Sequence, residues 1–169
     1  MVDYVKEITY VTTEIHPYYE SINKKLIEEF KDLEFTTEIY NRSGKKTNVR
    51  ALQTYNNIET PTLNLIKEWV INLIGGYAGY NYKVCHCWGA KYDKGDYTLS
   101  HDHFGCAFAF VYFVRSPKGS SPLVFTTSRK RIKPIEGKLV LFHGNLLHHV
   151  PKNKCDGRIV VAGNVLSFL

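Results

Sequence analysis

The stretch YTLSHDHFGCAFAFVYFV at residues 97–114 decides the fold that we predict for this chain. Its second half, CAFAFVYFV, contains no charged residue, which is typical of a strand buried on both faces. Its first half places Asp102 between His101 and His103. Side chains of a strand alternate between its two faces, so we expect both histidines to point to one side and Asp102 to the other. Two imidazoles on one face form part of a candidate metal site, and a third ligand must come from elsewhere.

The chain from residue 80 onward has the pattern of further short strands separated by glycine and proline turns. The strand-like segments are YNYKVCHCWGAKY at 80–92, LVFTT at 123–127, KLVLFHG at 138–144, HHV at 148–150 and RIVVAGNVLSF at 158–168. Strands of this length and spacing favour an antiparallel sandwich or barrel. We therefore predict a mainly β core over residues 80–169, which contains the candidate metal site.

Residues 1–79 have a different pattern, which is mixed and mainly helical. The segment PYYESINKKLIEEFKDL at 17–33 places apolar residues on one helical stripe. The segment TPTLNLIKEWVINLIGGY at 60–77 begins with Thr60 as an N-cap and continues as a second stripe until two glycines end it. We expect about two helices that pack on the outside of the β core, so that residues 1–169 form one domain.

The overall composition is that of an ordinary soluble globular protein, with 44% hydrophobic and 22% charged residues. No apolar run approaches the roughly 20 residues that a transmembrane helix needs. The N-terminal segment lacks a basic start followed by an apolar block, so we expect no secretory signal. The four cysteines do not have the spacing of a zinc site, so we expect reduced thiols. We therefore expect a cytoplasmic protein without a membrane partner.

The net charge of +6 raises the question of a polyanionic partner such as a nucleic acid. Most of the basic residues are scattered along the chain, but residues 128–133 have the sequence SRKRIK. Arg129, Arg131 and Lys133 alternate in this cluster, as on the solvent-exposed face of a strand. We expect a solvated strand face there, and the sequence leaves a nucleic-acid partner open.

A third ligand for the metal is available nearer the C-terminus. The segment LFHGNLLHHVPKN at 141–153 offers His143, His148 and His149. An H-x-H pair by itself is a weak pattern, and surface histidines are the commoner case. However, this pair opens an apolar strand, and Arg158 starts another strand ten residues after His148. An arginine is rarely buried unless it meets an anion, so a metal site beside this guanidinium fits an anionic, chelating cosubstrate.

The ordered pattern YDKGDYTLSHDH, FVYFV, EGKLVLFHGNLLHHV and RIVVAGN within residues 92–164 resembles the iron(II)- and 2-oxoglutarate-dependent oxygenases. The similarity is to the prolyl-4-hydroxylase-like branch, including oxygenases attributed to tailed phages of cyanobacteria, and it covers about residues 80–168, roughly half of the chain. It implies a double-stranded β-helix, a jelly roll of the cupin type, with the two helices outside. It also implies Fe(II), 2-oxoglutarate and dioxygen, and the hydroxylation of a substrate with decarboxylation of 2-oxoglutarate to succinate.

The resemblance also implies roles for single residues. It makes His101 the first metal ligand, His148 the distal ligand and Arg158 the anchor for the far carboxylate of 2-oxoglutarate. Tyr92 matches a tyrosine that hydrogen-bonds the cosubstrate in relatives, and an ordinary core tyrosine is the alternative. Asn164 lies on the same strand face as Arg158 and is expected to line the pocket.

Position 103 departs from the family pattern. Most relatives have a carboxylate there, which completes the two-histidine, one-carboxylate site of non-haem Fe(II) oxygenases, whereas this chain has His103. Asp102 leaves the strand on the opposite face unless a bulge intervenes, so we favour His101, His103 and His148 as the ligands over a set that includes Asp102. A third neutral imidazole does not offset a charge of the metal. We therefore expect good binding of the dianionic 2-oxoglutarate but weaker selection of Fe(II) against nickel, copper and zinc.

Two other functions stay open at the level of sequence. One is a dioxygenase with a three-histidine metal centre whose substrate itself chelates the metal, without 2-oxoglutarate. Arg158 argues against it, because such an enzyme has no need of a carboxylate anchor. The other is a β-sandwich domain that binds a metal or a partner without catalysis. The sequence does not decide the oligomeric state.

The substrate, a protein side chain or a small molecule, is expected to be selected by loops around the mouth of the barrel. We expect these loops at residues 41–58, 115–122 and 143–147. His143 stands where many relatives have proline and receives no role. His149 is expected on the surface, and a position beside the metal ligands or the substrate is the alternative.

Overall fold

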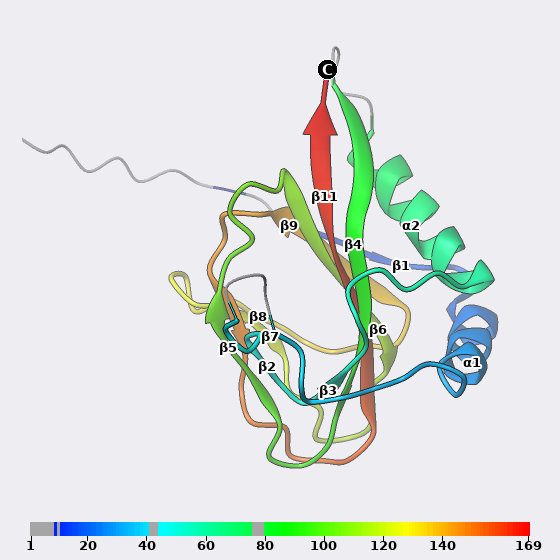
Figure 1. The fold of residues 1–169 in the computed structure, drawn as a ribbon, viewed down its shortest axis with the longest axis vertical. Coiled ribbons are helices and arrows are strands. Elements are labelled where there is room, and N and C mark those ends of the chain that lie inside the picture. The colour runs from blue at the N-terminus through cyan, green and yellow to red at the C-terminus, as the bar shows by residue number, and fades with distance from the viewer. Residues whose placement is uncertain (1–8, 10, 41–43, 76–79) are drawn as a thin grey trace, which may run out of the picture.

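The computed structural model describes residue 9 and residues 11–40, 44–75 and 80–169, which form two β-sheets and two helices (Figure 1). The larger sheet has six strands in the order β1-β9-β6-β11-β4-β3, which are Thr12–Ile15, Lys138–His143, Phe108–Arg115, Arg158–Phe168, Asn81–Tyr92 and Leu52–Gln53. The smaller sheet has five strands in the order β2-β5-β10-β7-β8, which are Val49–Arg50, Tyr97–His101, His148–Val150, Leu123–Phe125 and Arg131–Ile132.

From β4 to β11 the chain passes back and forth between the two sheets, and the named strands all pair in antiparallel fashion. This connectivity is that of a double-stranded β-helix. The predicted mainly β fold is therefore confirmed. None of the described helices is long and apolar enough to cross a membrane. All four cysteines are free, as expected.

Strand β6 shows why its sequence is almost free of charge. Its alternate residues Ala109, Val111 and Phe113 belong to the core between the two sheets, whereas Phe110, Tyr112 and Val114 belong to the core beneath the helices. All six are buried. A strand with an apolar core on both sides cannot alternate apolar with polar residues, and the unbroken apolar run is the consequence.

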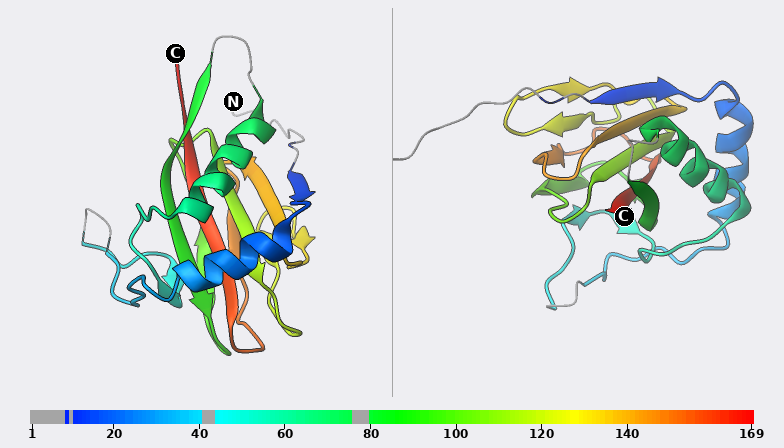
Figure 2. Two further views of the ribbon diagram at one scale, coloured as in Figure 1. Left: turned by 90° about the vertical axis from the view of Figure 1, so that its right-hand side faces the viewer. Right: turned by 90° about the horizontal axis from the view of Figure 1, so that it is seen from above.

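The helices α1 (Tyr19–Glu29) and α2 (Pro61–Ile74) lie across the outer face of the larger sheet (Figure 2). Both predicted helical stripes are confirmed by their buried apolar residues, including Leu26 in α1 and Ile66 in α2. Thr60 is the N-cap of α2, as predicted, because its side chain accepts a hydrogen bond from the backbone N–H of Leu63. The helix ends at Gly75, and Gly76, also predicted to end it, lies outside the described residues.

The N-terminal strand β1 is a feature that the sequence analysis missed. Its residues TTEI are all exposed, so they do not have the apolar alternation that marks a half-buried strand. The strand exists because it pairs with β9, from Thr12 opposite Leu141 to Ile15 opposite Lys138. It is the edge of the larger sheet, and its structure is set by that partner rather than by its own pattern.

Candidate metal centre

The three predicted histidines meet at one end of the space between the sheets. His101 ends β5 and is directly opposite His148, which begins β10. His103 lies in the turn that follows β5. The ring centroids are 4.4 Å apart for His101 and His148, 5.0 Å for His101 and His103, and 5.1 Å for His103 and His148. One possible ligand atom from each ring lies within 4.8 Å of the other two, which is the spacing of a metal centre.

The orientation of His101 depends on a bulge that the alternation argument did not include. His148 pairs with His101 but Val150 pairs with Thr98, so three steps along β5 match two steps along β10. This extra residue lets Thr98 and His101 face the same interior, although an odd number of positions separates them. The β-bulge thus aims the first histidine.

His103 is positioned by tertiary contacts and not by a strand. Its backbone N–H donates a hydrogen bond of 2.7 Å to the carbonyl of Gly144, in the turn between β9 and β10. A Cβ atom at residue 144 would overlap the carbonyl oxygen of Cys106, so only glycine allows this close approach. The turn that precedes His148 therefore also holds His103.

Asp102 lies outside the group of candidate ligands. Its side chain is exposed, and its Oδ1 accepts a hydrogen bond of 3.2 Å from the backbone N–H of Phe104. An aspartate in this position stabilises a local turn. Of the two alternatives from the sequence, His103 rather than Asp102 lies with His101 and His148.

Two of the histidines are oriented by the same local contact. His101 Nδ1 lies 2.8 Å from the carbonyl oxygen of Leu99, and His148 Nδ1 lies 2.7 Å from the carbonyl oxygen of Leu146. A carbonyl only accepts, so each Nδ1 carries the proton and each Nε2 keeps its lone pair. Imidazoles that donate one N–H to a carbonyl in this way are typical metal ligands. The donor set therefore fits a divalent metal ion.

The surroundings keep these imidazoles neutral. Burial, together with the nearby His148 and His101, lowers the pKa of His103 to about 3. Burial and His101 lower the pKa of His148 to about 4. Burial also lowers the pKa of His101, partly opposed by its hydrogen bond to the Leu99 carbonyl. All three rings are thus available as ligands at neutral pH.

The lowered pKa values predict that acid destabilises the metal-free protein. The unfolded histidines take up protons below their ordinary pKa of 6.5, before the folded ones do. Stability is therefore fully present above that value and is lost as the pH falls towards the folded pKa. For His103 alone the loss between about pH 7 and pH 5 amounts to about 2 kcal/mol. Urea unfolding in the presence of a chelator, in wild type and His103→Gln, measures this contribution.

The matched control for this experiment is His86→Gln, which changes an exposed histidine of β4. The pH dependence should become shallower in His103→Gln and stay as in wild type in His86→Gln. Equal pH dependence in wild type and His103→Gln would show that His103 is not held neutral by burial.

Arg158 is fully buried in the same interior, with 0% of its surface exposed. Its guanidinium carbon lies 4.4 Å from the ring centroid of Tyr92 and 5.6 Å from that of Phe113. Among the described residues, neither Nε nor Nη1 has a hydrogen-bond partner, and no carboxylate forms an ion pair with this side chain. Burial lowers the pKa of Arg158. A buried cation with unused donors is costly unless an anion binds there, so this end of the site fits a carboxylate.

The other two predicted pocket residues share the interior face. Tyr92 is directly opposite Arg158 in the pairing of β4 with β11, and its hydroxyl lies 2.7 Å from Oγ1 of Thr98. Asn164 is on the Arg158 face of β11, but it is six residues further along, about 20 Å for an extended strand. Its buried Oδ1 has no hydrogen-bond partner among the described residues. Arg158 and Tyr92 therefore lie together, whereas Asn164 lies towards the other end of the strand.

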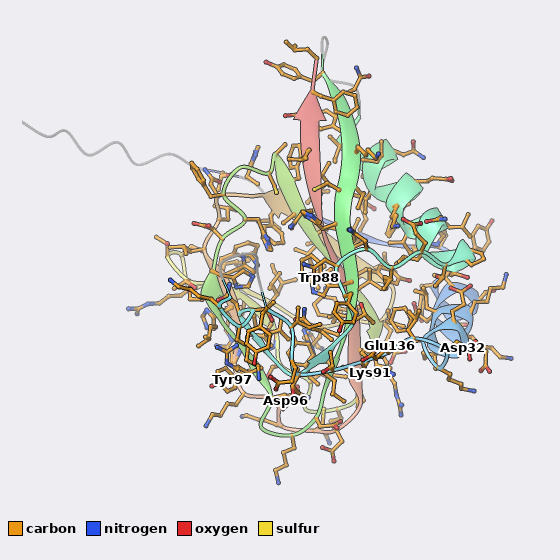
Figure 3. The ribbon with its side chains drawn as sticks, viewed as in Figure 1. Asp32, Trp88, Lys91, Asp96, Tyr97 and Glu136 are labelled. Atoms are coloured by element: carbon orange, nitrogen blue, oxygen red, sulfur yellow. The ribbon has the colours of Figure 1, made fainter. Side chains whose placement is uncertain are left out.

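Trp88 is a site residue that the sequence analysis missed. It lies in the second half of β4 (Figure 3), and its ring centroid is 6.2 Å from that of His103. A signal was present, because Trp88 precedes Tyr92 by four residues and therefore shares its face of the strand. This tryptophan forms part of the wall beside the histidines.

The predicted mouth loops are only partly correct. The 143–147 turn touches the histidines through Gly144, and Asn48, in the 44–58 segment, accepts a hydrogen bond from Leu99 of β5. Residues 41–43 lie outside the described residues. The prediction for 115–122 is wrong. This loop follows the C-terminal end of β6, whereas the turn that contains His103 precedes its N-terminal end, and the loop forms hydrogen bonds with Asn153 and Lys154.

The remaining two histidines of this region lie away from the interior. His149 is next to His148 on β10, so it faces the other way, and its Nδ1 lies 2.9 Å from Oγ1 of Thr126. His143 is exposed and stacks on Phe108 at 5.0 Å between ring centroids. Neither residue belongs to the three-histidine group.

The chain has the double-stranded β-helix fold found in oxygenases that use 2-oxoglutarate. One similar structure is the viral collagen prolyl hydroxylase of Paramecium bursaria Chlorella virus-1 in complex with 2-oxoglutarate (TM-score 0.70, 17% identity, covering 92% of this chain and 95% of that one). Another is a prolyl-4-hydroxylase of Pseudomonas putida (TM-score 0.71, 13% identity, 94% and 92%). A third is HygX of Streptomyces hygroscopicus with nickel and 2-oxoglutarate bound (TM-score 0.68, 9% identity, 93% and 82%). No family model and no curated protein matches the chain by sequence.

Proposed function

We propose that the protein is a non-haem Fe(II)- and 2-oxoglutarate-dependent dioxygenase. It would hydroxylate a substrate, a protein side chain or a small molecule, while 2-oxoglutarate is converted to succinate. The observation that carries this proposal is the fully buried guanidinium of Arg158, with unused donors, in the same interior as three neutral histidines. A metal site alone is compatible with many functions, but a carboxylate anchor beside it favours a chelating dicarboxylate.

His101, His103 and His148 would hold the metal through nitrogen lone pairs. With 2-oxoglutarate bound, Fe(II) supplies the activation of dioxygen for C–H hydroxylation. The chain itself keeps water away from this side of the centre. Phe142 packs against the ring of His148 at 4.8 Å between centroids, and Phe125 lies at 6.4 Å. These apolar neighbours also restrict the His148 ring to one orientation.

Arg158 would bind the far carboxylate of 2-oxoglutarate through a bidentate pair of hydrogen bonds. The guanidinium of Arg158 lies over the ring of Tyr92, and this contact would orient the guanidinium for the carboxylate. The 2-oxoglutarate in the structures of the viral prolyl hydroxylase and of HygX supports the proposal through their shared fold. We also propose that the protein belongs to the prolyl-hydroxylase-like branch and is related to phage oxygenases.

The decisive experiment is turnover after anaerobic reconstitution with Fe(II). We expect 2-oxoglutarate to be converted to succinate with uptake of dioxygen, slowly without substrate and faster with it. Dioxygen uptake without succinate formation would instead indicate a three-histidine dioxygenase that does not use 2-oxoglutarate. Tight metal binding that leaves no position for 2-oxoglutarate would indicate a structural site.

A change at position 103 tests which residue completes the centre. His103→Asp restores the carboxylate common in this fold, and we expect it to keep Fe(II) affinity within about tenfold of wild type. His103→Ala should lose about 100-fold or more. Asp102→Ala is the neighbouring control and should change metal affinity less than about threefold, because the Asp102 side chain hydrogen-bonds, among the described residues, only within its own turn. Anaerobic titration with Fe(II) measures all three; a large loss in Asp102→Ala would contradict the assignment.

A further inference from the structure

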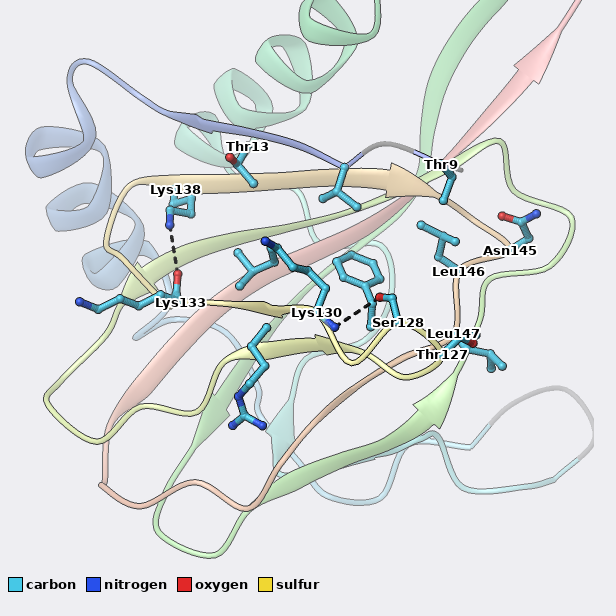
Figure 4. Close-up of a pocket in the computed structure, with 14 residues that line it drawn as sticks. Thr9, Thr13, Thr127, Ser128, Lys130, Lys133, Lys138, Asn145, Leu146 and Leu147 are labelled. Atoms are coloured by element: carbon cyan, nitrogen blue, oxygen red, sulfur yellow. Dashed lines mark hydrogen bonds between the residues drawn. The ribbon is translucent and has the colours of Figure 1, made fainter. Parts of the chain in front are cut away.

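A second hollow lies outside the metal centre, between the edge strands of the two sheets (Figure 4). One side is formed by β1 and β9 and the other by β8 with the turn that precedes it. Its volume is about 1220 Å³, above the roughly 300–1000 Å³ of typical small-molecule sites. We call it the basic groove, because four cationic side chains line it: Lys130, Arg131, Lys133 and Lys138.

No acidic side chain of the described residues forms an ion pair with the cations of the basic groove. The described residues that line it include no aspartate or glutamate. Among the described residues, none of its four cations forms an ion pair, and three of them are exposed. Lys138 Nζ donates a hydrogen bond of 3.2 Å to the carbonyl of Lys133, and burial together with the Lys133 charge lowers the pKa of Lys138. An anion in the groove would relieve this repulsion.

The cationic residues of SRKRIK are exposed, as expected for a solvated face, and their placement adds a second feature to that interpretation. Only Arg131 and Ile132 of that segment belong to a strand, and Arg129 has a positive φ of 58° in the turn before it. Lys130, Arg131 and Lys133 line one side of the groove, whose other side carries Lys138 from β9. The cluster in the sequence and a lysine from a separate strand therefore form one charged surface.

The walls of the groove favour a polypeptide as its anionic occupant. The edge strand of a sheet presents backbone groups that can pair with a further extended chain. The groove also has apolar side chains that are at least partly exposed, Val11, Leu146 and Leu147, and these suit apolar side chains of a ligand. Among the described residues that line the groove, the one aromatic is Phe125, which is only 4% exposed and so offers no open ring on which a base could stack.

We propose that the basic groove docks an extended, acidic segment of a partner protein. Carboxylates of the segment would pair with Lys130, Arg131, Lys133 and Lys138, and apolar side chains between them would cover the exposed apolar side chains of the groove. This interaction goes beyond the oxygenase function and does not depend on it, because the groove lies outside the metal centre and uses none of its ligands.

The test uses the full chain and a fluorescein-labelled peptide of alternating glutamate and valine, with binding followed by fluorescence anisotropy. The groove variant is Lys130→Glu/Lys133→Glu. The control variant is Lys24→Glu/Lys25→Glu, which makes the same change of charge at exposed positions of α1. We expect the groove variant to bind the peptide at least about tenfold more weakly than wild type, and the control less than about threefold. Thermal unfolding of both variants verifies that they fold.

Three results would overturn the proposal. The first is the absence of acidic-peptide binding by wild type at low ionic strength, where such contacts are strongest. An equal loss in both variants would mean that only the net charge matters. A single-stranded oligothymidylate of equal charge that binds more tightly than the peptide, and loses binding in the groove variant, would identify a nucleic-acid site instead.

Discussion

The variant His148→Ala is expected to bind Fe(II) or Ni(II) at least about 100-fold more weakly than wild type. The loss of a residue that merely orients a ligand costs about 10- to 100-fold in metal affinity, and the loss of a ligand should cost more. His148 is central to the group, since it is opposite His101 in the strand pairing and within 5.1 Å of His103 between ring centroids. Anaerobic calorimetric titration with either metal measures the effect.

The adjacent histidine provides the control. His149→Ala removes the same side chain one residue further along β10, where it faces Thr126 and not the interior. It should change metal affinity less than about threefold. His148→Gln tests whether a cavity is responsible, because it fills the space better than alanine but should lose the metal equally. Full metal occupancy in either His148 variant would show that His148 is not a metal ligand.

Replacement of Arg158 by methionine is expected to have opposite effects on binding and stability. The bidentate, charge-assisted pair with the far carboxylate is lost, so 2-oxoglutarate affinity should fall at least about 100-fold. The ligand-free protein should become more stable by about 1–3 kcal/mol, because a buried charge without an ionic partner is replaced by an apolar chain of similar length. Metal affinity should stay within about threefold of wild type.

Three measurements separate these effects. Calorimetry with Ni(II)-loaded protein gives the affinity for 2-oxoglutarate, metal titration gives the integrity of the centre, and urea unfolding gives the stability. Arg115→Met is the control, since Arg115 is the exposed arginine at the end of β6. A parallel loss of metal affinity, 2-oxoglutarate affinity and stability in Arg158→Met would show that Arg158 has a structural role.

The sequence predicted some residues of the candidate site, missed one and placed another only in part. His101, His148 and Arg158 followed from the ordered motif, and their joint placement in the interior agrees with it. Trp88 was missed, although its spacing from Tyr92 indicated a shared face. Asn164 was placed on the correct face, but it is six residues away from Arg158 along β11. Alternation along one strand predicts which face of the sheet a residue occupies. The position of that residue along the barrel depends on the register between neighbouring strands.

The sequence by itself determined the local elements whose pattern repeats along the chain. These include the two amphipathic helices, the Thr60 cap of α2 and the strand β6, which is buried on both faces. The sequence also favoured His103 over Asp102 as a ligand, but only the tertiary structure decided how the histidines converge, because a bulge in β5 and the contact with Gly144 aim these side chains. It also decided that SRKRIK and Lys138 share one groove. The periodicity of the sequence indicates which face of a helix or strand a residue occupies. The pairing of segments that are distant in the sequence determines which other residues that face contacts.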